Sequence, residues 1–330
     1  MSPNAGFNHK VEEQAAYLAN RLLKNEKSLR KWARNNDFHA LRLYDRDIPE
    51  IPLAIDRYET DRGVKLVVAL YERPYEKSDR EESLWLDAMV SAACTALAID
   101  NTSVFIKVRK HMRGLSQYDR NSDSHAEAIV QEAGLSFLVN LSDYLDTGLF
   151  IDHRLTRGMV ASQSKGKLVL NLFSYTSSFS VYAVSGGCRR VTSVDLSNTY
   201  LTWSRKNFLL NKIPESVHEE VRMDVMLYLK EARKAGRKWD FIIADPPTFS
   251  NSKKSPQDFD VNHDWPELLE HCASVLELNG QILFSTNSRQ LKWDGSKCPL
   301  EWQDITDATI PPDFRNKKIH RCWLLKATNQ

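Results

Sequence analysis

The sequence has few cysteines and none of the patterns in which cysteines hold small folds together. Its five cysteines, in 330 residues, are widely spaced and form no CxxC pair. This argues against a disulfide framework and against a structural zinc site, and no paired histidines suggest another metal. No stretch approaches the roughly 18 apolar residues of a membrane span, and the N-terminus lacks a signal core. We therefore expect a reduced, cytoplasmic chain that needs no metal and no membrane.

A marked excess of charge of one sign is also absent. The net charge is only +2, so the whole-chain balance neither argues for nor excludes a nucleic-acid partner. Hydrophobic residues make up 42% and charged residues 27%, which is typical of a soluble globular protein. A chain of 330 residues is long enough for about two domains.

The N-terminal part predicts a long helix followed by a small α+β domain. Residues 12–34 place leucines at helical spacing on one face and basic residues on the other. That basic face is either a solvated surface or a stripe that contacts phosphates, and it contains Arg21, Lys24, Lys27, Lys31 and Arg34.

Short strands and one helix follow in residues 38–110. The last strand there runs into a second basic patch, which contains Lys107, Arg109 and Lys110. Residues 115–124 are polar and rich in turn formers, which indicates a linker. We expect residues 1–120 to form one domain, with no catalytic constellation of its own.

From about residue 155 the pattern alternates strands with helices. This alternation predicts βαβ crossovers and a parallel sheet. The expected strands are 167–173, 191–197, 218–223, 239–247 and 280–286, with two late strands at 302–306 and 319–327. The expected helices are 176–186, 198–211, 225–235 and 263–278. We expect residues 121–330 to form the second domain, opened by a β-rich bridge at 121–151.

Acidic residues follow three of these strands, at the edge where open α/β sheets bind ligands. Asp195 ends the second strand, where a carboxylate suits the two hydroxyls of a ribose. Asp224 follows the third strand, where it can accept from an adenine amino group. Each acid alone could equally be a helix cap. There is no P-loop, so together they indicate an adenosine without a phosphate requirement.

The fourth strand ends in Asp245-Pro246-Pro247-Thr248, which is a stronger signal. Prolines are poor inside strands and helices, so two in succession shape a rigid loop. A simple strand-terminating turn is the alternative.

These segments together resemble the class I S-adenosylmethionine-dependent RNA methyltransferases. More closely, they resemble the guanine-N7 methyltransferase half of the bacterial bifunctional 23S rRNA methyltransferases. The resemblance runs from about residue 20 to the C-terminus and rests on NLFSYT, VDLS, DPPTFSNS, DYLDTGLFIDHR and DFRNKKIHRCWLL. It implies a Rossmann-like domain with a seven-stranded, mostly parallel sheet, preceded by a small α+β RNA-binding domain.

The resemblance also implies S-adenosylmethionine as cofactor and a role for each matched residue. The loop that lines the cofactor would be Phe173, Ser174, Tyr175 and Thr176. The ribose would be held by Asp195 with Leu196 and Ser197, the adenine by Asp224 with Val225, and the methionine end by Asp152 and Arg154. The wall between the sulfonium and the target base would be Asp245, Pro246, Pro247 and Thr248, the catalytic set.

This sequence departs from the family pattern at one position. The family reads FSYTG, whereas Ser177 and Ser178 follow Thr176 here. Glycine serves where backbone must approach a ligand closely. A serine is tolerated there if its φ is negative.

The residues also bear on which atom is methylated. Cytosine C5 needs a thiolate beside the site, and neither DPPTFSNS nor FSTNSRQ contains a cysteine. Guanine N7 carries an exposed lone pair and needs no general base. Exocyclic amines usually require an aromatic residue at the position of Thr248. We therefore expect methylation of guanosine N7 in 23S rRNA, or in an assembling large ribosomal subunit.

Reaching N7 requires an opened RNA helix, so a separate RNA-holding surface is expected. Besides the two basic patches, Lys253, Lys254 and Arg289 would contribute to it. The resemblance adds a separate guanine-N2 methyltransferase domain as a partner. The alternatives are methylation of a guanine amine or of cytosine, a small-molecule methyltransferase, and a non-catalytic RNA-binding assembly factor.

Overall fold

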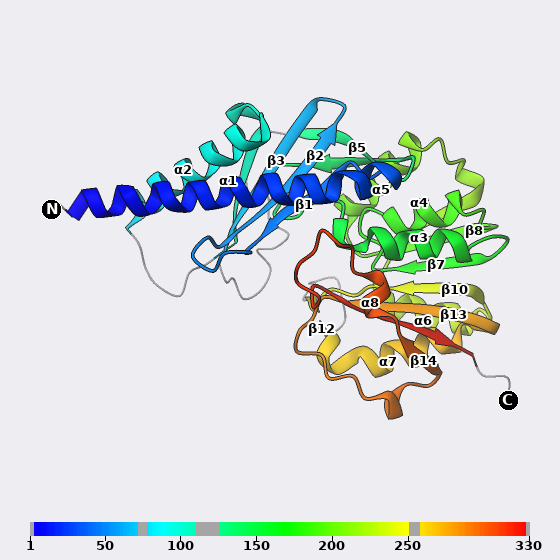
Figure 1. Ribbon diagram of the computed structural model, residues 1–330. Coiled ribbons are helices and arrows are strands. Elements are labelled where there is room, and N and C mark those ends of the chain that lie inside the picture. The colour runs from blue at the N-terminus through cyan, green and yellow to red at the C-terminus, as the bar shows by residue number, and fades with distance from the viewer. Residues whose placement is uncertain (1–2, 72–77, 110–125, 251–257, 328–330) are drawn as a thin grey trace. The chain divides into compact units, whose positions relative to one another are not determined.

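The computed structural model describes residues 3–71, 78–109, 126–250 and 258–327 (Figure 1). The chain divides into two compact units. The first comprises Met1–Gly134, Val139–Thr147 and Pro312–Arg315, and the second comprises Leu135–Leu138, Gly148–Pro311 and Asn316–Gln330. None of the described helices has the length and apolar character that a membrane span needs.

The first unit is a sheet packed against two helices, α1 (Pro3–Asn35) and α2 (Asp79–Leu97). Leu22 of α1 and Trp85 of α2 share one core cluster with Ile55 and Val68 of the sheet. The strands of this sheet are β1 (Ala40–Asp45), β2 (Leu53–Thr60), β3 (Gly63–Tyr71), β4 (Val104–Arg109), β5 (Glu127–Glu132) and β6 (Leu135–Asn140), and the division assigns Leu135–Leu138 of β6 to the second unit. Their order is β4-β3-β2-β5-β6, and β1 pairs with β2.

The second unit contains a seven-stranded sheet in the order β14-β15-β13-β10-β7-β8-β9. β9, β8, β7, β10 and β13 pair in parallel, whereas β15 is antiparallel to both β13 and β14. The strands are β7 (Leu168–Leu172), β8 (Arg190–Asp195), β9 (His218–Arg222), β10 (Trp239–Ala244), β13 (Leu276–Thr286), β14 (Glu301–Asp304) and β15 (Arg321–Lys326). The predicted α/β fold with a seven-stranded, mostly parallel sheet is confirmed.

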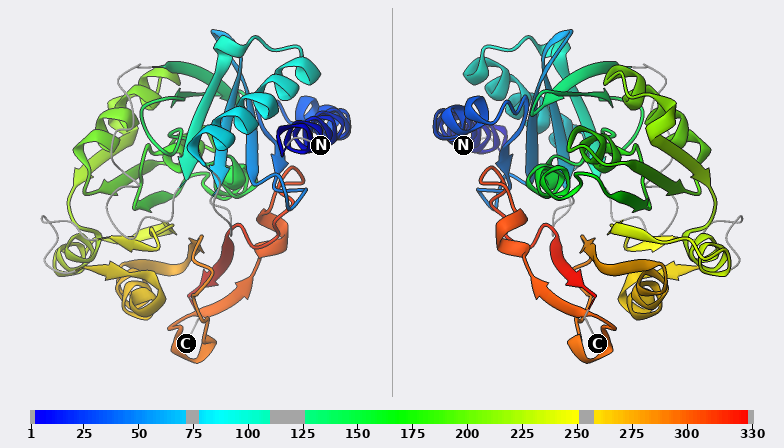
Figure 2. Two further views of the ribbon diagram at one scale, coloured as in Figure 1. Left: turned by 90° about the vertical axis from the view of Figure 1, so that its left-hand side faces the viewer. Right: turned by 90° about the vertical axis from the view of Figure 1, so that its right-hand side faces the viewer.

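Helices cover both faces of this sheet (Figures 1 and 2). Successive residues of a strand point to opposite faces, so Ile242 and Ile243 of β10 enter different core clusters. Ile242 packs with residues of α6 and α7, and Ile243 packs with residues of α3 and α4. Burial on both faces explains why these strands read as continuous apolar runs. The helices are α3 (Arg154–Gln163), α4 (Ser178–Ser185), α5 (Asn198–Leu210), α6 (Val225–Lys234), α7 (Val261–Ser274) and α8 (Thr306–Thr309).

Several boundaries differ from those expected. The helix expected at 263–278 ends earlier, because α7 ends at Ser274. The strand that follows, β13, begins at Leu276, which pairs with Trp239 of β10. The sequence also gave no indication of α3 or of the short pair β11 (Phe249–Ser250) and β12 (Phe259–Asp260). Most described residues of the expected bridge at 121–151 belong to the first unit, because β5 pairs with β2. The division therefore lies near residue 147 rather than residue 120.

Candidate active site

The predicted site residues gather at one edge of the second unit's sheet, where its parallel strands end. The strand order changes direction between β7 and β10, and in open α/β sheets ligands bind beside such a switch point. The loop after β7 begins with Phe173, β8 ends in Asp195, and β10 is followed by Asp245. A site for a ligand is therefore expected across these three ends.

The loop after β7 is fixed by hydrogen bonds from both sides. The Ser174 N–H donates to the Val194 carbonyl over 3.0 Å, and the Tyr175 N–H donates to Oδ2 of Asp195 over 2.9 Å. Oγ1 of Thr176 donates to the Gly148 carbonyl over 2.6 Å. The loop is thus tied to β8 and to the segment that leads into Asp152. The hydroxyl of Ser174 is buried and has no hydrogen-bond partner among the described residues.

Ser177 adopts a backbone conformation that favours glycine. Its φ is +60° and its ψ is 30°, the left-handed region, so the negative φ at which a serine is tolerated is not met. The turn into α4 sets this angle, and the family's glycine is the residue that adopts it without strain. Its buried hydroxyl also lacks a hydrogen-bond partner among the described residues.

We expect Ser177→Gly to raise the free energy of unfolding by about 1 kcal/mol. The left-handed conformation costs a residue other than glycine about 1–2 kcal/mol, partly offset by the greater freedom of glycine in the unfolded chain. Urea denaturation measures the change. The matched control is Ser178→Gly in the first turn of α4, which should lower stability by roughly 0.5–1 kcal/mol. If both changes lowered the free energy of unfolding, the proposal that the backbone of Ser177 is strained would be contradicted.

Asp195 is held so that its carboxylate can accept further hydrogen bonds. Oδ1 accepts from the Ser197 N–H over 2.8 Å and Oδ2 from the Tyr175 N–H over 2.9 Å. Burial raises the pKa of Asp195 to about 6, and these backbone donors oppose that rise. Each oxygen accepts one of these two bonds and has a second lone pair, which matches the two hydroxyls of a ribose. The carboxylate and the Ser174 hydroxyl, which has no hydrogen-bond partner in the described part of the chain, fit an adenosine at this edge.

Asp224 and Val225 have positions that suit structural as well as binding roles. Oδ1 of Asp224 caps α6 by accepting from the Leu227 N–H over 3.0 Å. Val225 is buried in the core cluster beside α7. The backbone N–H of Leu196 also lowers the pKa of Asp195, and Ser197 caps α5 through its hydroxyl. Contact of these residues with an adenine stays a prediction.

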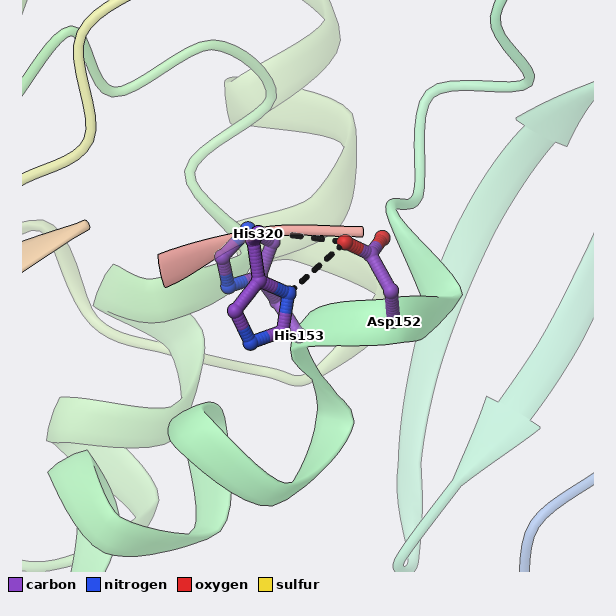
Figure 3. Close-up of side chains that lie close together, drawn as sticks. All are labelled: Asp152, His153 and His320. Carbon is purple, nitrogen blue, oxygen red and sulfur yellow. Dashed lines mark hydrogen bonds and ion pairs between the residues drawn. The ribbon is translucent and has the colours of Figure 1, made fainter. Parts of the chain in front are cut away.

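Asp152 and Arg154 lie in the turn that opens α3. Asp152 is half-buried and its Oδ2 lies 3.0 Å from Nδ1 of His320 (Figure 3). Arg154 is buried, with 1% of its surface exposed. His153, between them, stacks on His320 with ring centroids 4.4 Å apart. Sequence reasoning missed both histidines, although His153 stands within the quoted DYLDTGLFIDHR segment and His320 within DFRNKKIHRCWLL.

The loop after β10 is joined to β13 and to the segment that follows it. Oδ1 of Asp245 accepts from the Ser285 hydroxyl over 2.6 Å. The Thr248 hydroxyl donates to Oδ1 of Asn287 over 2.8 Å. Pro246 is buried and Pro247 is half-buried, so the two prolines stand between these anchors. Phe249, which follows Thr248, is 43% exposed and so is not part of the core.

The predicted RNA-binding residues differ in their exposure and contacts in the structure. Lys24, Lys27, Lys31 and Arg34 are exposed on α1, whereas Arg21 lies 3.6 Å from Asp47. The prediction for Lys107 is wrong, because this side chain is buried and its Nζ donates to the Tyr144 carbonyl over 2.6 Å. The Arg109 side chain, Lys110, Lys253 and Lys254 lie outside the part that the structure describes.

Arg289 is exposed and lines a hollow of about 960 Å³ in the second unit. The hollow begins beside Asn287 and His320, and it extends to α8 and to the segment before β15. Its exposed cations Arg289, Lys317 and Lys318 form no ion pair with any described residue. We refer to this surface, with these three cations, as the basic hollow.

Known proteins similar to this chain agree with the fold and the cofactor. Residues 55–294 match the S-adenosylmethionine-dependent methyltransferase family. The chain is 42% identical over 310 residues to ribosomal RNA large subunit methyltransferase K of Neisseria meningitidis, covering 94% of this chain and 86% of that protein. It is 41% identical to ribosomal RNA large subunit methyltransferase K/L of a Shewanella species, covering 96% of this chain. It spans only 44% of that longer relative.

A solved structure extends the similarity to the cofactor. It is described as that of a methyltransferase complexed with SAH, with a TM-score of 0.75 and 26% identity, and the match covers 95% of this chain and 82% of that one. SAH is what S-adenosylmethionine becomes when it has given up its methyl group. The match to the family extends across most of the chain and includes the ends of β7, β8 and β10. The chain therefore belongs to the S-adenosylmethionine-dependent methyltransferase family.

Proposed function

We propose that this chain transfers a methyl group from S-adenosylmethionine to N7 of a guanosine in 23S rRNA. The names of the two relatives, both ribosomal RNA large subunit methyltransferases, support ribosomal RNA as the substrate. The target atom is a finer proposal that rests on the residues beside the cofactor site.

The observation that carries the proposal is the hydrogen bond from Thr248 to Asn287. It takes one lone pair of the Asn287 amide oxygen and orients the amide, and Nδ2 donates to no described residue. Guanine presents two acceptors on one edge, N7 and O6. A donor at O6 would orient this edge and leave the N7 lone pair accessible. A nucleophilic amine needs an acceptor for its hydrogens instead, and Thr248 already takes one of the two lone pairs of the Asn287 oxygen.

The cysteines argue against cytosine C5 as the target. That carbon becomes nucleophilic only after a thiolate adds to the ring. All five cysteines are described: four are buried and Cys298 is half-buried. Burial raises the pKa of every one of them, to about 11 for Cys188 and well above the ordinary value for Cys322. A thiol with a raised pKa is a poor nucleophile near neutral pH.

S-adenosylmethionine supplies an electrophilic methyl group, so the protein's own task is to position the base and exclude water. Asp195 would hold the ribose, and the prolines after Asp245 would keep the loop rigid. Ser285 fixes the Asp245 carboxylate from the neighbouring strand. Positioning of two reactants can contribute up to roughly 7–11 kcal/mol in well-oriented cases, and N7 requires no general base.

The basic hollow would hold RNA phosphates close to the target base. The N7 edge of a paired guanosine lies in a deep, narrow groove, so the nucleotide must be extruded before it can react. Arg289 follows Asn287 closely in sequence, and Lys317 and Lys318 precede His320. Three cations with no ion-pair partner among the described residues, beside the proposed base-binding amide, suit the backbone that flanks an extruded nucleotide.

The test is transfer of labelled methyl from S-adenosylmethionine to 23S rRNA that lacks its native modifications, followed by nucleoside chromatography. Label in 7-methylguanosine is the expected result. Label in another nucleoside would keep the enzyme class and overturn the target atom. Absence of label from rRNA, with cofactor binding intact, would contradict rRNA as the substrate of this chain alone.

Neutralising the basic hollow is expected to reduce the salt dependence of RNA binding. Each phosphate contact on a single strand contributes about 0.7 to the slope of log K against log salt, so a variant with Arg289, Lys317 and Lys318 all changed to alanine should lose about two units. Fluorescence anisotropy across a salt series measures the slope. Alanine at Lys24, Lys27 and Lys31 tests the α1 stripe in the same way.

The matched control carries alanine at Arg233, Lys234 and Lys297, three exposed cations that do not line the basic hollow. Its net charge equals that of the test variant. An equal loss of slope in the control would attribute the effect to overall charge and contradict a specific RNA surface.

A further inference from the structure

A chain of hydrogen bonds runs from α8 through His320 to Asp152. The Thr309 hydroxyl donates to the Thr306 carbonyl over 2.7 Å. The same hydroxyl oxygen lies 2.9 Å from Nε2 of His320. The other ring nitrogen of His320, Nδ1, lies 3.0 Å from Oδ2 of Asp152 (Figure 3).

Counting hydrogens along this chain fixes the protonation of the ring. A hydroxyl has one hydrogen, and a carbonyl can only accept, so the Thr309 hydrogen is used on Thr306. Nε2 of His320 must therefore donate to Thr309. If Asp152 is ionised, Nδ1 must donate as well, and an imidazole that donates from both nitrogens carries a positive charge.

The alternative is a proton on Asp152 and a neutral ring. A carboxylic acid is ordinarily a stronger acid than an imidazolium by about 2–3 pKa units, so the shared proton favours the histidine. The ring of His320 is almost fully buried, with 1% of its surface exposed. Its positive charge is thus paired with Asp152 at one nitrogen and hydrogen-bonded to a neutral hydroxyl at the other.

The second histidine differs in protonation from the first. His153 stacks on His320 at an angle of 15°, and its Nδ1 is buried without a hydrogen-bond partner among the described residues. Nε2 of His153 lies 3.7 Å from Oδ2 of both Asp152 and Asp245. Burial lowers the pKa of His153, against the attraction of these two carboxylates, and the neighbouring His320 lowers it further. A neutral ring therefore stacks on a charged one.

The same three side chains do not suit a metal ion, although their ligand atoms all lie within 4.8 Å of one another. A metal ion binds an imidazole nitrogen in the plane of the ring, at about 2.0–2.1 Å for zinc. The two rings are stacked nearly parallel, so their in-plane lone pairs cannot converge on one ion. Both nitrogens of His320 are also engaged in hydrogen bonds.

We propose that His320 is a doubly protonated positioning residue that holds Asp152 ionised and oriented toward the ammonium group of the cofactor's methionine end. This rests on the proposed role of Asp152, and it is independent of the RNA substrate and of the methylated atom. The anchor is rigid, because the Cys322 N–H donates to Oγ1 of Thr306 over 3.0 Å and the Ile305 N–H donates to the Cys322 carbonyl over 2.9 Å. These bonds tie the start of α8 to β15, next to His320.

The first test is ¹⁵N NMR of the histidine side chains in the cofactor-free protein. His320, assigned by the signal that His320→Asn removes, should show two protonated nitrogens at neutral pH. Thr309→Val removes the acceptor of Nε2 and should remove that proton at this pH, whereas Thr309→Ser should retain it. A singly protonated His320 in the unchanged protein would overturn the proposal.

The second test is calorimetry of S-adenosylmethionine binding without RNA. His320→Asn should weaken binding about 10- to 100-fold, the usual effect of losing a hydrogen bond to a charged group. Thr309→Val should weaken it less, and Thr309→Ser should restore it. His9→Asn, at a side chain 74% exposed on α1, is the control and should have no effect. Unchanged binding in both His320→Asn and Thr309→Val would also overturn the proposal.

Discussion

Asp195→Ala is expected to weaken S-adenosylmethionine binding by about two to four orders of magnitude. A hydrogen bond to a charged group contributes about 1.5–3 kcal/mol, and a ribose offers this carboxylate two hydroxyl donors. The change also removes the acceptor of the Tyr175 N–H, which fixes the cofactor loop. Isothermal titration calorimetry measures the loss. Glu231→Ala, at an exposed carboxylate on α6, is the control and should bind as the unchanged protein does.

The pH dependence of binding provides a second check on Asp195. Burial raises its pKa to about 6, so the folded protein protonates this group more readily than the unfolded chain does. Its contribution to stability is therefore present at acidic pH and is lost as the pH rises through about 6. Cofactor binding should follow the opposite trend, because the ribose hydroxyls donate to the ionised carboxylate. Affinity should fall as the pH drops through about 6, and Asp195→Asn should bind weakly without this dependence.

The parts of the site that the sequence predicted are those set by local pattern. Alternating strands and helices require a parallel sheet, and a parallel sheet brings the ends of its strands to one edge. The positions of Asp195 and Asp245 at that edge follow from this rule alone. Their roles toward cofactor and base needed the resemblance, and they stay predictions until binding and transfer are measured.

The parts that the sequence could not predict depend on contacts distant in the chain or on one backbone angle. His320 is 168 residues from Asp152, and no spacing rule connects them. Lys107 stands in a run of basic residues, but strand alternation in β4 turns it inward while Ile106 and Val108 are exposed. The φ of Ser177 is set by the turn into α4 rather than by the preference of serine.

Gly148→Ala is expected to lower the free energy of unfolding by about 2–5 kcal/mol. Gly148 has a φ of +91°, and a Cβ there would lie 2.1 Å from Cζ2 of Trp203. The ring cannot move aside freely, because its Nε1 donates to the Leu138 carbonyl over 3.0 Å. The unfavourable angle costs about 1–2 kcal/mol and overpacking about 1–3 kcal/mol.

The same substitution should also weaken cofactor binding, because the Gly148 carbonyl accepts from Thr176 and Trp203 lies beside Tyr175. Urea denaturation and calorimetry measure the two effects. Gly166→Ala is the matched control, since Gly166 has a φ of +72° and nothing within 4 Å of the added Cβ. Gly166→Ala should lower the free energy of unfolding by only about 1–2 kcal/mol, which is the cost of the backbone angle. It should bind the cofactor as the unchanged protein does. If Gly148→Ala costs no more than Gly166→Ala, Trp203 does not constrain the cofactor loop, and the hydrogen bonds to Val194, Asp195, Gly148 and Asn207 hold the loop after β7 without it.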